Sequence, residues 1–356
     1  MSSVEIMKLI KGNVLSLKPY QVESTDCEIK LHANENPFPP SKELLELFST
    51  SFQKLQLNRY PDPDSRALKD SIADRLGIET KHLVIGNGSD EIILFLLQVF
   101  CQEGDTIAFP DPTFSMYSII AQSLGIKSVR IPLDSHWDFS ADVILQSAEE
   151  NNSKIIFLSY PNNPTGNCFS DTQLQKVIES FQGIVVIDEA YHDFSRKSFV
   201  NQIREHNNLV VLRSLSKIGL AALRVGFGVA DPLVISEINK VRLPYNSNTI
   251  SQAFAEHLIT NFEAVQTQID SILDERHRLL GELHKIESVT PFPSDSNFIL
   301  FKTKQPAGSI FAFLAKNGIL VRNLSSHPKL NNCLRVTVGT KSENDRFLSK
   351  LKDFKS

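Results

Sequence analysis

From about residue 82, the chain alternates short apolar runs with stretches of helical, amphipathic period. Such runs are typical of buried strands, and we expect strands at 82–85, 106–109, 128–131, 154–158, 184–187, 209–212 and 225–230. We expect helices between them at 89–100, 116–123, 170–180 and 232–241. This alternation predicts an α/β fold, with a mostly parallel sheet covered by helices on both faces.

The pattern differs on either side of this region. Residues 1–40 carry few helix signals and are predicted to be irregular, while helices should begin after Ser41 and end before Gly77. Beyond residue 245 we expect a long helical stretch at 249–286, strands at 298–302, 320–322 and 334–338, and helices at 307–316 and 343–353. We therefore predict a large domain at 41–245 and a smaller α+β domain formed by 1–40 and 246–356.

Composition narrows the class of protein. The chain has 356 residues, of which 41% are hydrophobic and 22% charged, as is typical of soluble globular proteins. A net charge of −4 and the lack of a Lys/Arg run argue against nucleic-acid or membrane-surface partners. The longest apolar run, 92–100, is about half of the ~20 residues that a membrane span needs.

The cysteines give no sign of a metal site or of disulfides. They are far apart and share no metal-like spacing: Cys27, Cys101, Cys168 and Cys333. The N-terminus also shows no secretory signal. We therefore expect reduced thiols, a cytoplasmic location and no bound metal.

Candidate chemistry lies at the carboxyl ends of the predicted strands, where parallel sheets bind ligands. Lys217 follows the strand at 209–212, and partial burial there favours the uncharged amine that forms imines. A solvated loop lysine is the alternative. Asp188 follows four apolar residues and should be desolvated, with Tyr191 near it, although an aspartate capping the next helix fits too.

Two further loops add polar groups. Gly88, Ser89 and Asp90 precede an apolar helix, so their backbone N–H groups could bind a phosphate or simply form an ordinary N-cap. Asn163 lies in a Pro- and Asn-dense turn that is either a ligand contact or a plain turn. Together the loops supply an amine, a carboxylate, a phenol, an amide, hydroxyls and a phosphate cradle, which is the set that pyridoxal 5′-phosphate requires.

At these residues the sequence resembles a known family, the fold-type I, class-II pyridoxal-phosphate-dependent aminotransferases, and within them the histidinol-phosphate aminotransferases. The ordered motifs are Asn163-Pro-Thr-Gly166, Asp188-Glu-Ala-Tyr191 and Ser214-Leu-Ser-Lys217 with Arg224. Subfamily-like pieces are Asn34-Glu-Asn-Pro37, Arg59-Tyr-Pro-Asp62, Gly88-Ser-Asp-Glu91, Pro112-Thr-Phe-Ser-Met-Tyr117, Val321-Arg-Asn323 and Leu334-Arg-Val-Thr-Val-Gly339. The resemblance covers nearly the whole chain.

The resemblance implies roles for particular residues. Lys217 would form the imine with the cofactor and move the substrate proton, and Asp188 would pair with the pyridinium nitrogen. The other implied cofactor contacts are Tyr191 and Asn163 at the phenolate oxygen, Phe114 on the ring face, and Ser89, Asp90, Ser214, Ser216 and Arg224 at the phosphate. Tyr60 would reach the phosphate from a partner subunit, which implies a homodimer with a shared site.

The resemblance also implies substrates. Arg335 would bind the α-carboxylate of glutamate and also the phosphate of histidinol phosphate, and Arg322 would be a second arginine for that phosphate. Tyr20 and Asn34 would line the substrate side. The implied reaction is transamination between L-histidinol phosphate and 2-oxoglutarate in histidine biosynthesis. Alternatives are an aromatic or broad-specificity aminotransferase, a threonine-phosphate decarboxylase-like enzyme and a cofactor-binding regulator. The regulator is disfavoured because the N-terminal extension is short and not basic.

Overall fold

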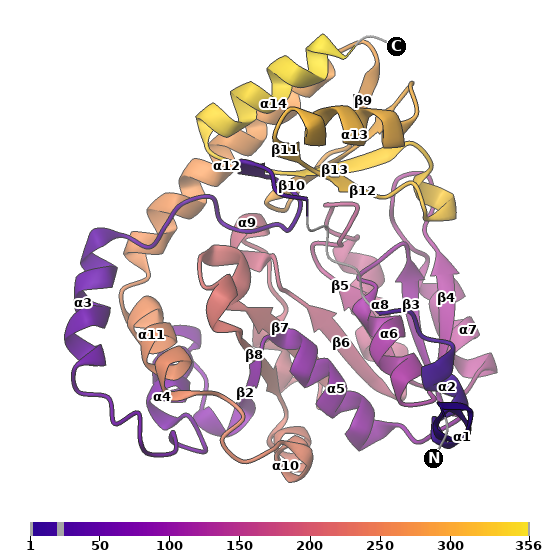
Figure 1. Ribbon diagram of the computed structural model, residues 1–356. Helices are drawn as coiled ribbons and strands as arrows, with labels where there is room; N and C mark the ends of the chain where they lie inside the picture. Colours follow the sequence, from indigo (N-terminus) through magenta and orange to yellow (C-terminus); the bar gives the residue numbers. More distant parts are fainter. Residues whose placement is uncertain (1–2, 20–24, 355–356) are drawn as a thin grey trace.

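The computed structural model describes residues 3–19 and 25–354, and its centre is a seven-stranded sheet in the order β2-β8-β7-β6-β5-β3-β4 (Figure 1). The strands are β2 (Leu83–Asn87), β3 (Thr106–Asp111), β4 (Lys127–Pro132), β5 (Ser153–Ser159), β6 (Ile184–Asp188), β7 (Leu209–Ser214) and β8 (Val225–Ala230). Strands β3 to β7 pair in parallel, whereas β8 runs antiparallel to both neighbours. The predicted α/β class and mostly parallel sheet are confirmed.

Alternate side chains of each strand supply two apolar layers. On β7, Leu209 and Val211 face one layer, while Val210 and Leu212 face the other. The second layer is covered by α5 (Ser89–Phe100), α6 (Met116–Ser123) and α10 (Pro232–Val241). The first is covered by α4 (Arg66–Leu76), α7 (Ala141–Glu150), α8 (Asp171–Ser180) and α11 (Thr249–Thr260). Burial on both faces explains why the inner strands are mostly apolar, whereas the edge strand β4 is largely exposed and carries Lys127, Ser128 and Arg130.

Local capping signals determine where the first long helix begins and where the second one ends. Ser41 precedes α3 (Lys42–Phe52), and its Oγ accepts the backbone N–H of Leu44 at 3.2 Å. Helix α4 ends at Gly77, whose φ of 64° closes the last turn in the left-handed conformation that glycine favours. Both boundaries lie where the sequence predicts them.

The second, smaller part of the molecule lies above the carboxyl ends of the large sheet and at the top of Figure 1. Its four-stranded antiparallel sheet has the order β12 (Arg322–Asn323), β13 (Cys333–Thr337), β10 (Phe298–Thr303) and β9 (Val289–Pro291). Next to it lie α13 (Ala307–Lys316), α14 (Lys341–Asp353) and a parallel pair formed by β1 (Ile29–Lys30) and β11 (Ile319–Leu320). The long α12 (Glu263–His284) leads up to this part along one side.

Three sequence expectations are wrong. The helical stretch at 249–286 is two helices, because Asn261 leaves the helical conformation (φ −116°, ψ 41°) between α11 and α12. The strand at 320–322 is divided between β11 and β12, which belong to different sheets. Residues 1–40 are not wholly irregular, since α1 (Ser3–Leu9) and α2 (Gly12–Leu15) form there.

A long-range contact accompanies the N-terminal helices. The Asn13 side chain donates to the carbonyls of Gln122 and Ser123, both at 3.0 Å, at the end of α6. This stretch therefore contacts the large sheet's layer of helices, whereas residues 29–34 join the smaller part. The division into domains at 41 and 245 stays a prediction.

Short elements complete the described chain. They are α9 (His192–Ser195) and 3₁₀ turns at Thr80–His82, Val200–Arg204, Leu215–Ile218, Ala221–Leu223 and Pro328–Leu330. Within residues 3–19 and 25–354, each helix is too short or too polar to cross a membrane.

Candidate active site

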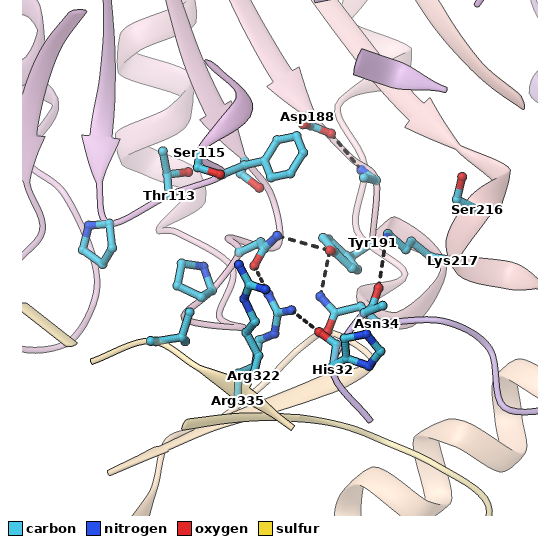
Figure 2. A pocket seen from close by; sticks show the side chains of 18 of the residues that line it. His32, Asn34, Thr113, Ser115, Asp188, Tyr191, Ser216, Lys217, Arg322 and Arg335 are labelled. Carbon is cyan, nitrogen blue, oxygen red and sulfur yellow. Dashed lines mark hydrogen bonds between the residues drawn. The ribbon is translucent and has the colours of Figure 1, made fainter. Parts of the chain in front are cut away.

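A cavity of about 490 Å³ lies between the carboxyl ends of the large sheet and the small sheet (Figure 2). It brings together thirteen of the predicted site residues: Asn34, Ser89, Asp90, Phe114, Asn163, Asp188, Tyr191, Ser214, Ser216, Lys217, Arg224, Arg322 and Arg335. Two others are not among its lining residues. Tyr60 is 81% exposed and stacks on Tyr245 at a ring-centroid distance of 4.5 Å, and Tyr20 lies outside the described residues.

Asp188 ends β6 and presents a buried carboxyl group to the cavity. Its Oδ1 accepts the N–H of Ala190 at 3.1 Å, and its Oδ2 accepts the hydroxyl of Tyr117 at 2.7 Å. Burial raises the pKa of Asp188 to about 6, and these two donors act against that rise. The carboxyl group caps no helix, because the next one begins after Tyr191, so a cationic ligand in the cavity is its natural partner.

Lys217 is held in a 3₁₀ turn directly after β7. The side chain is half-buried, and its Nζ donates to the carbonyl of Ala33 at 3.4 Å. The Nζ lies 5.7 Å from the ring centroid of Tyr191, so amine and phenol share one side of the cavity. This position favours the reactive amine over the solvated loop lysine that the sequence also allows.

Two amides hold the phenol of Tyr191. Its Oη accepts Nδ2 of Asn34 at 2.9 Å and Nδ2 of Asn163 at 3.4 Å. Asn34 has a positive φ of 56° and exchanges hydrogen bonds with Thr337, which fixes the amide. Because Tyr191 accepts in both contacts, its own proton can be donated to a ligand oxygen in the cavity.

The start of α5 forms an anion cradle. Gly88 precedes the helix with a φ of 75°, and no side chain among the described residues caps the first turn. Arg224 donates from Nη1 to Oγ of Ser216 at 3.2 Å, and its Nη2 lies 3.4 Å from Oδ2 of Asp90. Exposed N–H groups, the positive helix end, a hydroxyl and a guanidinium group suit a phosphate. The ordinary N-cap is therefore the weaker interpretation.

Two glycines make this cradle sterically possible. A Cβ on Gly88 would lie 2.6 Å from Nη2 of Arg224, inside van der Waals contact. A Cβ on Gly226 of β8 would lie 2.4 Å from the backbone N of Ser89. The strand therefore passes directly against the helix start. A side chain at Gly88 would meet Arg224, and one at Gly226 would displace the backbone of the cradle.

Two arginines form the opposite side of the cavity. Arg322 of β12 and Arg335 of β13 are cross-strand partners, and Figure 2 shows them away from Asp188. Arg335 is 8% exposed, and its Nη2 donates to the carbonyl of His32 at 2.8 Å. Its Nη1 donates to Oδ1 of Asn163, which also contacts Tyr191. Arg335 is thus linked to the phenol through the amide of Asn163.

The structure also places residues in or behind the cavity that the sequence analysis assigned no role. Thr113, Asn323 and His327 line it, and His327 Nε2 lies 3.0 Å from Oδ2 of Asp111 across the two parts of the molecule. Tyr117 lies behind Asp188. Tyr117 closes the motif at 112–117, three residues after Phe114, and this is the one sequence signal that includes it.

The comparisons with known proteins agree with this geometry. The profile of the family "Aminotransferase class I and II" matches residues 27–351. The chain is 39% identical over 355 residues to "Histidinol-phosphate aminotransferase 2" of Nitrosococcus oceani (99% of each chain). It is also 39% identical over 347 residues to "Histidinol-phosphate aminotransferase" of Aquifex aeolicus (97% of this chain, 98% of the other).

A solved structure shares the fold. It is the histidinol-phosphate aminotransferase of Sinorhizobium meliloti in complex with pyridoxal 5′-phosphate, which aligns with a TM-score of 0.87 at 20% identity and covers 97% and 96% of the two chains. The family profile spans most of the chain, including every residue that lines the cavity. The chain therefore belongs to the class I and II aminotransferases.

Proposed function

We propose that this enzyme transfers the amino group of L-histidinol phosphate to 2-oxoglutarate in histidine biosynthesis. The products are 3-(imidazol-4-yl)-2-oxopropyl phosphate and L-glutamate. The observation that carries the proposal is the pairing of Arg322 with Arg335 on the wall facing Asp188 and Lys217. The names of the relatives at 39% identity support the same substrate.

The residues fit pyridoxal 5′-phosphate, the cofactor of this family. The cradle at the start of α5 would hold its phosphate through Ser89, Asp90, Ser214, Ser216 and Arg224. Asp188 would face the ring nitrogen, Tyr191 and Asn163 the phenolate oxygen and Phe114 the ring face, and Lys217 would hold the aldehyde carbon. When bound, the cofactor supplies the electron sink for the pair released from the donor's C–H bond.

Three side chains of the protein would each have a separate role in the reaction. The Lys217 amine would take the proton from the amino-bearing carbon of the donor and would deliver it to the former aldehyde carbon of the cofactor. The Asp188 carboxylate would keep a proton on the ring nitrogen, because a buried negative charge favours a positive partner. The proton of Tyr191 stabilises the oxygen beside the reacting centre.

The arginine pair explains how one pocket serves two anions. Guanidinium groups bind phosphates and carboxylates with the same planar, bidentate geometry. Histidinol phosphate presents a phosphate and glutamate an α-carboxylate, so Arg335 would bind either donor in turn, while Arg322 would add a second contact to the phosphate. Asn34 and Tyr20 belong to the substrate side of this proposal, and Asn34 also positions Tyr191.

A shared site between two copies of the chain is part of the proposal. Tyr60 and Tyr245 form a stacked pair on the surface, away from the cavity of their own chain. In a homodimer, Tyr60 would reach the cofactor phosphate of the partner subunit. Cytoplasmic location likewise stays a prediction.

The experiment is product analysis with the purified holoenzyme. With L-histidinol phosphate and 2-oxoglutarate, we expect glutamate and the oxo-phosphate product in equal amounts. Incubation with threonine phosphate should release no CO₂. Release of CO₂ without glutamate would instead identify a threonine-phosphate decarboxylase-like enzyme and reject the transaminase.

A further inference from the structure

We infer that Tyr117 is a positioning residue for Asp188, whose hydroxyl makes this carboxylate a weaker base and so keeps the proton on the cofactor's ring nitrogen. The inference rests on the proposed function in that it takes Asp188 to face that nitrogen. It adds a residue behind the cavity, outside the set that lines it.

The Tyr117 hydroxyl donates to Asp188, and the hydroxyl of Ser159 lies beside it. The Tyr117 Oη lies 2.7 Å from Oδ2 of Asp188, while Oδ1 accepts the N–H of Ala190. The tyrosine is fully buried on α6, with its ring stacked on Phe157 (4.8 Å, 16°) and edge-on to Phe114 (5.5 Å). These rings hold the hydroxyl in place, so the hydrogen bond does not depend on a mobile side chain.

The direction of the hydrogen bond is fixed by burial. Desolvation and the neighbouring carboxylate raise the pKa of Tyr117 well above its ordinary value, so it remains a donor. A hydrogen bond donated to the charged form of an acid lowers that acid's pKa. Burial, with Asp90 and Glu189 nearby, raises the pKa of Asp188, and Tyr117 is the largest influence that opposes this rise.

One proton would be shared between the Asp188 carboxylate and the ring nitrogen of the cofactor. It stays on the nitrogen only while the carboxylate is the weaker base of the two. Without the Tyr117 hydroxyl, the carboxyl group would take a larger share of that proton. The ring would then withdraw electrons less strongly, and the imine at Lys217 would become more basic.

The chain offers a matched control. Tyr160 is also fully buried, and its hydroxyl donates to a carboxylate, that of Asp171, but neither residue lines the cavity. Tyr117→Phe and Tyr160→Phe therefore remove the same hydroxyl from a hydrogen bond to a carboxylate, which is buried at Asp188 and exposed at Asp171. Thermal unfolding of the two apoproteins reports any general loss of folding.

The measurement is the pH midpoint at which the visible absorption band of the holoenzyme changes. We expect Tyr117→Phe to raise this midpoint, in the same direction as Asp188→Asn but by less, while Tyr160→Phe leaves it at the wild-type value. We also expect cofactor affinity to fall about tenfold in Tyr117→Phe, because one hydrogen bond to a charged group is lost. When Asp188→Asn is already present, adding Tyr117→Phe should not shift the pH midpoint further, because the Tyr117 hydroxyl acts only through the Asp188 carboxylate.

The outcomes separate this inference from the proposed function. If Asp188→Asn itself leaves the midpoint unchanged, the assignment of Asp188 to the ring nitrogen is wrong. If Asp188→Asn raises the midpoint and Tyr117→Phe does not, the role of Tyr117 is wrong. Should Tyr117→Phe fail to fold, site-specific fluorotyrosine at 117 provides a stronger donor, and the midpoint should move down.

Discussion

Arg322 and Arg335 lie directly opposite each other on neighbouring antiparallel strands of the small sheet. Like charges at such positions destabilise a sheet, because their Cβ atoms are only about 5 Å apart. The same two side chains line the cavity, so a bound anion can offset the repulsion. The pair is therefore better explained by a ligand than by the stability of the sheet.

Removing each arginine should distinguish their roles. We expect Arg335→Ala to lower kcat/KM for glutamate and for histidinol phosphate by roughly 10- to 150-fold each, the loss of hydrogen bonds to a charged group. Arg322→Ala should mainly affect the phosphorylated donor. Arg346→Ala, which removes a surface partner of Glu28, is the control and should leave both values unchanged. Equal losses on all donors in Arg322→Ala would contradict a two-arginine pocket.

Lys217→Ala should abolish turnover. Loss of the amine removes the group that holds the cofactor and moves the proton, and we expect activity to fall by about 10⁴-fold or more. The visible absorption band of the holoenzyme should also lose its dependence on added donor. Lys176→Ala removes a lysine that pairs with Asp142 on the surface and should behave like the wild type. Retained turnover in Lys217→Ala would exclude this lysine as the reactive amine.

The buried carboxyl group of Asp188 should make the apoprotein's stability depend on pH. Its pKa rises from about 3.9 in the unfolded chain to about 6 in the fold, so the folded state binds the extra proton. The resulting stabilisation is fully present below about pH 4 and is lost as pH rises through about 6.

Asp188→Asn tests this dependence because it cannot ionise. Relative to the wild-type apoprotein, its free energy of unfolding should be higher at pH 8 by up to about 3 kcal/mol, with the difference shrinking toward pH 4. Urea unfolding of both apoproteins across this range measures it. A constant difference at all pH values would show that Asp188 does not titrate in this window.

The glycine cradle makes a steric prediction. Gly226→Ala places a Cβ against the backbone of Gly88 and Ser89, and should destabilise the fold by about 1–3 kcal/mol and weaken cofactor binding. Gly281→Ala in α12 meets no atom within 4 Å among the described residues, and should stabilise by about 0.5–1 kcal/mol. Thermal unfolding and cofactor titration compare the two. Unchanged cofactor affinity in Gly226→Ala would mean that the cradle does not hold the phosphate.

Much of the fold could be predicted because it follows from local patterns. The inner strands of the large sheet are mostly apolar runs since both of their faces are buried, and Ser41 and Gly77 carry capping signals that act within one turn. The break at Asn261 was missed because apolar periodicity continues on both sides of it. The contact of Asn13 with the end of α6 joins residues more than a hundred positions apart in the sequence, and no local pattern predicts it.

Much of the site could also be predicted, but from short motifs and not from the apolar pattern. Its loops carry motifs, so Lys217, Asp188 and Asn163 could be named before any geometry was known. Tyr117 could not be assigned a role from the sequence. Its apolar ring fits the buried face of α6, and nothing in the sequence shows that its hydroxyl meets Asp188. The contact of His327 with Asp111 also joins the connection between β12 and β13 to the large sheet, and only tertiary structure brings these two together.

The most direct test of the account is a comparison of kcat/KM for L-histidinol phosphate, L-histidinol and L-phenylalanine, with 2-oxoglutarate as acceptor. The first two donors differ only in the phosphate that Arg322 and Arg335 are proposed to bind. We predict that histidinol phosphate is the preferred donor, by roughly 10- to 150-fold over histidinol. No turnover of histidinol phosphate alongside good turnover of phenylalanine would contradict the account and indicate an aromatic aminotransferase.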